Sequence, residues 1–582
     1  MANPKNLSAY EIAFAGRVID ANKLQALSRV CSIAHISQVG CGHFESHAES
    51  GGVSTAVVQC GRTARAVFVL FAAASSFASG HTTAEEAAAG AGVDLAAVST
   101  VPSVRGPIAV SAGSEIFAPA VLPGTAEAAL LEKAGYEQQE FFLSGTAKAY
   151  GQDGALGLVI ARDGIPYGTR VVVVRPRNPK VFSGNAHLTI GHPQFGMIQW
   201  DRVSRYVLGH GDVYVAVMTG GDALSRRAST PNAPVAAPLA LKWFEPERYR
   251  AIDWPDDDAI RWDVFGQVAL LLKGGDGPFA DLKVERVYAS GWSFIGSFLR
   301  TFIQDGFHER FKTSDGKPAI DGYLIGISSG SVGAGHVPLT SSTVSASTSN
   351  TDAVLPDAVL RRIDAPIIEL QSENEAVTNR EPQTPDSDAI AGGHRLYELG
   401  GVSHTDIGRE SVNPVMAQLM ARHHPYAAAA SACDAPPTDV PMADVAGAAL
   451  WNLDRWSRAG IAPPRAEPIT VNALTHQSEK DEIGNTLGGI RVAQLDVPLG
   501  RYGPPPESTH CAVTNPHGFL VIRRNPLDPE TLRRRYPGGK SDYLARFTAR
   551  LNQLVQQRWL VRADADVERQ MAETNAVSAF GH

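Results

Sequence analysis

The chain has 582 residues, of which 44% are hydrophobic and 19% are charged, a composition typical of a folded globular protein. Asp and Glu number 60 against 52 for Lys and Arg, so the net charge of −8 gives no electrostatic support for a nucleic-acid partner. The 5 Cys residues show no Cys-x-x-Cys spacing, and neither a disulfide framework nor a zinc site is predicted.

Residues 1–125 are rich in Ala, Gly and Ser, and we expect them to form an N-terminal extension that carries no recognisable chemical site. Their longest apolar run, 66–74, is far shorter than the ~20 residues that a membrane span requires. We interpret this run as a buried helix. Arginines precede it and small residues follow it, so residues 62–78 also resemble a secretory signal. Read from Met1 the chain is expected to be soluble and cytoplasmic, and export is the alternative if this segment is a signal.

Short apolar segments alternate with helical segments between residues 126 and 540, and this region is the predicted catalytic domain. Strands are predicted at 169–175, 186–190, 213–217, 283–289, 323–327 and 366–370. Such an alternation indicates a mostly parallel central sheet with helices on both faces, whose ligands bind beyond the carboxyl ends of the strands. Cap or lid insertions are expected at about 225–262 and 331–356, and a helical segment is expected at 541–582.

A serine flanked by glycines stands between a predicted strand and a predicted helix. The segment Ser290-Gly291-Trp292-Ser293-Phe294-Ile295-Gly296 follows strand 283–289 and precedes the helix-like run 297–303. This arrangement predicts a nucleophile elbow, in which a strained turn presents a serine at a helix N-terminus. The motif Gly-x-Ser-x-Gly would require a second glycine at position 295, whereas here it comes one residue later, at Gly296. Ser293 is the candidate nucleophile.

A nucleophilic serine needs a histidine base and an acid that orients this base. The predicted strand at 366–370 runs directly into Gln371-Ser372-Glu373-Asn374-Glu375. Either glutamate could serve as the acid. We prefer Glu375, because the acid usually lies a few residues beyond the strand end, and Glu373 remains the alternative. His404 follows in a loop of small residues, far enough along the chain for one helix to intervene, and is the candidate base.

Several segments in one order resemble the α/β-hydrolase superfamily, and within it a group of long, mostly uncharacterised bacterial proteins. The matching segments are Glu140-Phe141-Phe142-Leu143-Ser144-Gly145-Thr146-Ala147, 166–173, Phe182-Ser183-Gly184, Gly291-Trp292-Ser293, 372–375 and Tyr397-Glu398-Leu399. The resemblance covers roughly residues 130 to 530 and implies an α/β-hydrolase fold with esterase-like activity. Two departures stand out, because the family usually carries Gln-Ser after the nucleophile and Trp-Leu-Asn-Val after the third strand. Here Phe294-Ile295 and Gly191-His192-Pro193-Gln194 occupy these places, and we expect the bulky pair to make the pocket floor more apolar.

The resemblance implies that a small-molecule ester acylates Ser293 while His404 transfers the proton and Glu375 orients the imidazole. The backbone N–H of Phe294 and one from the Gly191-His192 turn are the expected oxyanion donors.

Other substrates of the same three residues remain open, namely lactones, amides and carbon–carbon bonds, as does a non-catalytic binding protein on a hydrolase scaffold. No metal, nucleotide or redox cofactor is predicted, because the sequence carries no P-loop or Gly-x-Gly-x-x-Gly turn between a strand and a helix and no cluster with ligand spacing. Acyl-chain preference and oligomeric state are not predicted from the sequence.

Overall fold

The structure is a computed structural model that describes residues 45–48, 53–60, 64–71, 101–153, 157–193, 196–224, 241–256, 258–328, 337–339, 359–378, 383–404, 414–423, 435–506 and 521–581. The chain divides into two compact units, Met1–Val93 and Asp94–His582.

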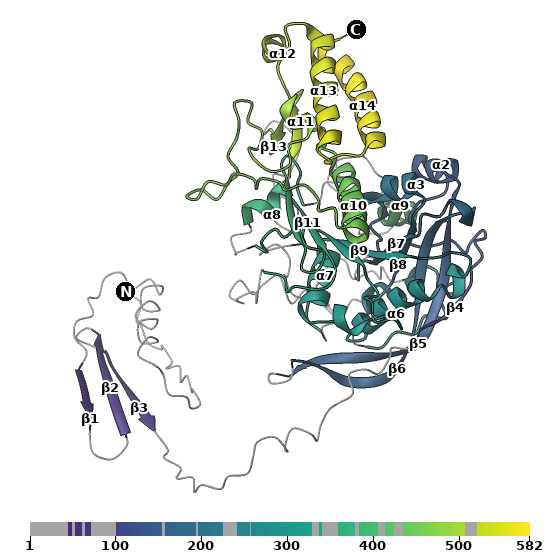
Figure 1. Ribbon diagram of the computed structural model, residues 1–582, viewed down its shortest axis with the longest axis vertical. Coiled ribbons are helices and arrows are strands. Elements are labelled where there is room, and N and C mark those ends of the chain that lie inside the picture. The colour runs from purple at the N-terminus through teal and green to yellow at the C-terminus, as the bar shows by residue number, and fades with distance from the viewer. Residues whose placement is uncertain are drawn as a thin grey trace. The chain divides into compact units, whose positions relative to one another are not determined.

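The first unit contains an antiparallel sheet in the order β1-β2-β3 (Figure 1). Its strands are β1 (Glu45–Ala48), β2 (Val53–Cys60) and β3 (Ala64–Phe71). The helix expected at 66–74 is therefore wrong for residues 66–71, which pair with β2 along their whole length. The run is rich in valine and phenylalanine, which favour strands, and a short apolar run has no period that separates strand from helix. The other parts of the possible signal, 62–63 and 72–78, lie outside the described residues.

The second unit is built on a nine-stranded sheet in the order β12-β11-β10-β9-β7-β8-β6-β5-β4 (Figure 1). The strands are β4 (Ser103–Arg105), β5 (Tyr136–Asp153), β6 (Gly157–Pro176), β7 (Asn185–Ile190), β8 (Val213–Val217), β9 (Arg286–Trp292), β10 (Gly322–Gly326), β11 (Ile367–Ser372) and β12 (His394–Leu399). All pairings from β12 to β8 are parallel, whereas β6 runs antiparallel to both β8 and β5. The mostly parallel sheet of the predicted α/β-hydrolase fold is confirmed.

Helices cover both faces of this sheet (Figure 1). The described helices of this unit are α2 (Ala126–Lys133), α3 (Ser204–His210), α4 (Gly221–Leu224), α5 (Leu241–Phe244), α6 (Arg261–Gly274), α7 (Phe294–Gln304), α8 (Glu373–Thr378), α9 (Pro414–Ala421), α10 (Met442–Ala459), α11 (Ala493–Asp496), α12 (Pro529–Arg535), α13 (Gly539–Gln556) and α14 (Arg562–Phe580). Short 3-10 turns are η1 (Pro179–Val181), η2 (Trp200–Arg202), η3 (Gly277–Phe279) and η4 (His308–Arg310). Near the C-terminus, β13 (Gly500–Gly503) pairs antiparallel with β14 (Arg523–Pro526). No helix within the described ranges is long and apolar enough to cross a membrane.

Alternate residues of the central strands enter two separate hydrophobic cores. On β6, Val171 and Val173 pack into the core that contains α6 and α7, while Val172 and Val174 pack into the core that contains α3 and α10. Because both faces are buried, the strand reads as a continuous apolar run rather than as an alternating one. This explains why the sequence predicted the strand so clearly.

Residues 101–125 belong to the second unit, although their composition placed them with the N-terminal extension. The buried guanidinium of Arg170 donates to the carbonyl oxygens of Phe117 and Ala118 and also pairs with Glu140. A buried charge needs such partners, because an unpaired one is strongly disfavoured in the interior. These contacts therefore tie the segment to β5 and β6.

The tryptophans near the expected first insertion belong mainly to the core. Trp262 is fully buried and stacks on Phe298 of α7, with ring centroids 4.6 Å apart. Trp254 is also buried and donates from its indole nitrogen to Asp258. The remaining parts of the two expected cap or lid segments, 225–240 and most of 331–356, lie outside the described residues.

Candidate active site

Ser293 lies between the end of β9 and the start of α7. Its backbone has φ 57° and ψ −126°, a left-handed conformation that is strained for any residue other than glycine. Strain of this kind costs about 1–3 kcal/mol and persists only when the surrounding structure enforces it. Here the N–H of Ser293 donates to the carbonyl oxygen of Gly326 on β10, at 3.0 Å. The turn has the conformation that a nucleophile elbow requires.

The displaced glycine of the motif has a packing reason. A Cβ atom on Gly296 would lie 2.4 Å from Oγ of Ser328 and 2.8 Å from the carbonyl oxygen of Gly326. The small residue is therefore needed where α7 passes the end of β10. At position 295 the side chain instead points into the core, and Ile295 is 0% exposed. The expectation that Ile295 forms part of a pocket floor is wrong, whereas Phe294 stays half-buried.

The predicted base and acid lie in line with the serine. Oγ of Ser293 is 2.8 Å from Nε2 of His404, and Nδ1 of the same ring is 2.6 Å from Oε1 of Glu375. Glu375 is 0% exposed and His404 is 7% exposed. A carboxylate only accepts hydrogen bonds, so Nδ1 must carry the donated hydrogen and Nε2 of the neutral ring can accept from the serine hydroxyl.

Three residues of the acid turn, which we define as residues 372–375, hold His404 directly or through Glu375. Ser372 donates from its N–H, at 3.0 Å, and from its hydroxyl, at 2.5 Å, to Oε2 of Glu375. The Oδ1 of Asn374 accepts from the backbone N–H of His404 at 2.8 Å. The carboxylate of Glu375 and the backbone of His404 are therefore both fixed by residues of the acid turn.

Glu373, the alternative acid, points to other partners. It accepts hydrogen bonds from Nζ of Lys480 at 2.6 Å and from the N–H of Gly401 at 2.9 Å, and also from the hydroxyl of Ser478. Burial alone would raise the pKa of this carboxyl, but the nearby Lys480 and the hydrogen bonds outweigh it and lower the pKa. The described contacts thus bring Glu375 to His404, while Glu373 fastens the loop that leads to it.

The two expected groups of oxyanion donors differ. Phe294 begins α7, where a helix leaves its first backbone N–H groups without partners inside the helix and carries a partial positive charge. By contrast, the N–H of Gly191 donates to Val217 at 2.9 Å and that of His192 donates to Met197 at 2.8 Å. The expectation that one of this pair binds an oxyanion is wrong for the described conformation, because the fold already uses both N–H groups. The next residues, 194–195, lie outside the described part of the chain.

A buried ionic cluster joins the elements that carry the three candidate residues. Glu369 on β11 accepts from Arg300 on α7 and from Nε2 of His394 on β12, the latter at 3.0 Å. Burial acts to raise the pKa of Glu369, but Arg300 and His394 outweigh it and lower the pKa to about 2. The cluster therefore holds together α7, β11 and β12, the elements next to Ser293, Glu375 and His404.

Sequence reasoning missed the supporting roles of Ser372, Asn374 and Lys480. The first two stand beside the predicted acid in a short polar turn after a strand, a pattern that indicates side-chain hydrogen bonds to the local backbone. No local pattern could have identified Lys480, because it lies 107 residues from Glu373 in the chain. Among the described residues, no group of three or more His, Cys, Asp or Glu side chains is arranged to hold a metal ion.

A family model described as "Alpha/beta hydrolase domain" matches residues 104–570 of this chain. A search of curated proteins found no match. Among solved structures, a thermostable esterase from Pseudomonas putida is 15% identical, with 44% of this chain and 72% of that chain covered and a TM-score of 0.22. Brefeldin A esterase, described as a bacterial homologue of human hormone sensitive lipase, is 13% identical over 44% and 72%, with a TM-score of 0.22. S-formylglutathione hydrolase from Staphylococcus aureus is 9% identical over 40% and 80%, with a TM-score of 0.20.

Proposed function

Because the chain belongs to the alpha/beta hydrolase domain family, we propose that it is a serine hydrolase that cleaves carboxylic esters of small molecules through an acyl-enzyme. The observation that carries the proposal is the continuous hydrogen-bonded series from Ser293 through His404 to Glu375, with distances of 2.8 and 2.6 Å. Its order along the chain, serine then acid then histidine, is the order typical of this fold.

In the first half-reaction, Oγ of Ser293 attacks the ester carbonyl carbon while Nε2 of His404 takes the hydroxyl proton. The imidazolium gives this proton to the leaving alcohol when the carbon–oxygen bond of the ester breaks. Glu375 stabilises the imidazolium through Nδ1 and keeps the ring in the productive orientation. The product at this stage is an acyl ester of Ser293.

In the second half-reaction, a water molecule gives a proton to Nε2 of His404 and attacks the acyl carbon. The proton then returns to Oγ of Ser293 as the carboxylic acid leaves. During both attacks the carbonyl oxygen becomes negatively charged, and the N–H of Phe294 at the N-terminus of α7 is the donor we assign to it. Loss of one such donor typically reduces kcat by about 10² to 10³.

The proposal is tested by turnover of p-nitrophenyl acetate and butyrate, compared with a γ-lactone and a p-nitroanilide. We expect ester turnover with an initial burst of p-nitrophenol close to one equivalent of enzyme, provided that deacylation is the slower step. Preference for the lactone or the anilide would assign a different substrate class to the same three residues.

The matched control is Ser293→Ala. It should reduce kcat at least about 10³-fold, because the attacking oxygen is removed. Urea unfolding should change little, since alanine occupies the same strained backbone position. Turnover by this variant at the wild-type rate would contradict the proposal, and so would a folded wild-type protein that hydrolyses none of the four substrates.

A further inference from the structure

The side chain of Gln199 hydrogen-bonds to the peptide groups directly before the candidate nucleophile. Its Nε2 donates to the carbonyl oxygen of Trp292 at 3.0 Å, and its Oε1 accepts from the N–H of Trp292 at 2.9 Å. A carbonyl oxygen can only accept and an N–H can only donate, so this network fixes which end of the carboxamide is which. Gln199 is 8% exposed, and both bonds are therefore shielded from water.

The carboxamide of Gln199 occupies the place where β7 would otherwise pair with Trp292 of β9. The parallel register of β7 with β9 runs from Asn185 opposite Arg286 to Leu188 opposite Ala289. Continued for three more residues it would place Gly191 opposite Trp292 and direct the N–H of His192 to the carbonyl oxygen of Trp292, but this N–H donates to Met197 instead. A carboxamide carries one donor and one acceptor side by side, as an extended peptide unit does, so Gln199 can replace the missing strand.

On the other flank, β9 remains paired with β10 up to Trp292 opposite Gly326, and the N–H of Ser293 donates to Gly326. Backbone groups just before the strained serine are thus held from both sides. Such strain persists only where the surroundings over-determine it. Removal of one flank should let Trp292 shift and carry Oγ of Ser293 away from His404.

We infer that Gln199 is a positioning residue, whose carboxamide fixes the peptide of Trp292 and thereby aligns Ser293 with His404 for attack. This inference rests on the proposed function.

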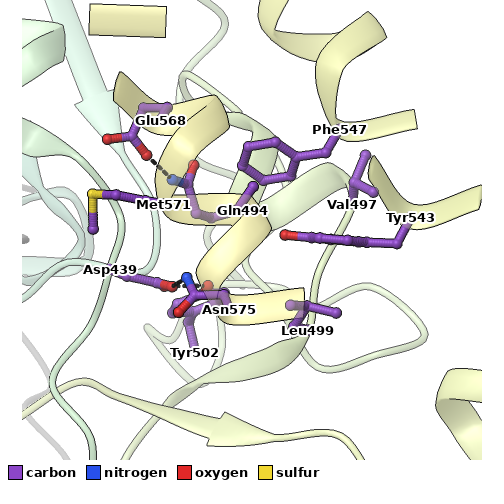
Figure 2. A pocket seen from close by; sticks show the side chains of 11 residues that line it. Asp439, Gln494, Val497, Leu499, Tyr502, Tyr543, Phe547, Glu568, Met571 and Asn575 are labelled. Atoms are coloured by element: carbon purple, nitrogen blue, oxygen red, sulfur yellow. Dashed lines mark hydrogen bonds between the residues drawn. The ribbon is translucent and has the colours of Figure 1, made fainter. Parts of the chain in front are cut away.

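The test compares Gln199→Met, which keeps the length and removes both hydrogen bonds, with Gln494→Met. Gln494 is the matched control, since it is 6% exposed and its carboxamide donates to Glu568 at 2.5 Å. Figure 2 shows this pair in the pocket beside Tyr543 and Phe547, which belong to α13. Both variants lose a buried carboxamide with a described hydrogen bond, and only one of them loses a contact with the elbow.

We expect Gln199→Met to reduce kcat, and the rate of labelling by a fluorophosphonate, by about 10- to 100-fold, because a misplacement of the order of 1 Å costs about that much. KM should change by less than about threefold, since substrate binding does not use this carboxamide. Gln494→Met should stay within about twofold of wild type in both rates. Equal rates in the two variants, at matched folded fractions, would overturn the inference.

Gln199→Glu gives a second readout, one that a purely structural role would not produce. An ionised carboxylate cannot donate to the carbonyl of Trp292, whereas the protonated acid can both donate and accept. Activity relative to wild type at the same pH should therefore recover as the pH falls and the carboxyl protonates. The Met variant should show no such recovery. A flat ratio for Gln199→Glu across the pH range would overturn the inference.

Amide hydrogen exchange separates this inference from the proposed function. Exchange at the N–H of Trp292 should be faster in Gln199→Met than in wild type and unchanged in Gln494→Met. This measurement needs no turnover. If wild-type protein is neither labelled nor active, the proposed function fails, while the exchange result still supports or overturns the contact of Gln199 with the elbow.

Discussion

Two turns follow parallel strands at the carboxyl edge of the sheet, and they are held in opposite ways. The acid turn after β11 uses side chains, since Ser372, Asn374 and Glu375 all hydrogen-bond within the turn or to His404. The turn after β7 uses its backbone, since the N–H groups of Gly191 and His192 donate to other main-chain carbonyls. A single side-chain substitution can therefore disable the first turn, whereas it leaves the backbone hydrogen bonds of the second intact.

The largest effect should separate the two glutamates inside the acid turn. Glu375→Gln should lower kcat by about 10³- to 10⁴-fold, because a neutral amide neither fixes the Nδ1–H tautomer of His404 nor stabilises the imidazolium. Glu373→Gln should keep most of kcat and lose about 1–2 kcal/mol of unfolding free energy, since Lys480 loses its charged partner at a partly exposed site. The measurements are steady-state kinetics and urea unfolding of both variants.

A reversed outcome, in which Glu373→Gln abolishes turnover and Glu375→Gln does not, would assign the acid role to Glu373. It would also mean that the acid turn differs in solution from the described one. The pair is well matched, because both residues change from carboxylate to carboxamide, two positions apart on one turn.

A second test concerns Glu369, which lies on β11 just before the acid turn. It asks whether the ionised form of this carboxyl stabilises the fold. Its pKa is lowered from 4.5 to about 2, so the ionised form stabilises the fold. This contribution, of the order of 3 kcal/mol, is complete above about pH 5 and is lost as the pH falls through 4.5 towards 2. The difference in unfolding free energy between wild type and Glu369→Gln should therefore shrink between pH 6 and about pH 3.

Urea titrations at a series of pH values provide this difference, and the other carboxyl groups largely cancel because both proteins contain them. Arg300 and His394 are the hydrogen-bonding partners of Glu369, and both remain in the two proteins. A difference that stays constant over the whole pH range would show that Glu369 is not held in its ionised form.

Near Ser293, the packing depends on the close contact between α7 and the end of β10 rather than on polar side chains. Gly296→Ala should reduce the unfolding free energy by about 1–3 kcal/mol, because the new methyl group meets Ser328 and the carbonyl of Gly326. The control is Gly209→Ala in α3, where a Cβ meets nothing within 4 Å, and alanine should stabilise that helix by up to about 1 kcal/mol. Thermal and urea unfolding compare the two, and equal effects would contradict the packing reason for the displaced glycine.

The smallest expected effect concerns the residue that the sequence placed at the pocket floor. Ile295→Val should cost about 0.5–1.5 kcal/mol of unfolding free energy, since a buried methylene is removed from the core. The preference among acyl-chain lengths should not change, because this side chain is 0% exposed. A change in the preference among p-nitrophenyl esters of different chain length would contradict this and indicate that Ile295 lines the pocket.

The sequence predicted the parts of the fold that repeat a strong local pattern. The strand predicted at 213–217 has the same limits as β8 (Val213–Val217), because it is buried on both faces and bounded by turn residues. The run at 66–74 carried an equally apolar pattern but was assigned as a helix, since a short apolar run does not reveal its pairing partner.

At the candidate site, the residues predicted from the sequence are those placed by strand ends. Ser293, Glu375 and His404 each follow a strand, and strand ends can be read from hydrophobic runs. Contacts between distant segments could not be predicted, as with Lys480 on Glu373, because no local pattern encodes them. It could not be predicted either that the N–H groups of Gly191 and His192 donate to main-chain carbonyls, because every residue except proline has such a group.

The central claim is that Ser293 is the nucleophile, and the most direct measurement is peptide mapping after reaction with a fluorophosphonate. We expect a single adduct on Ser293 in the wild-type protein, with no adduct at this position or another serine in Ser293→Ala. Glu373→Gln should still be labelled on Ser293. An adduct on Ser297, equal labelling of Ser293→Ala, or no labelling of a folded wild-type protein would contradict the claim.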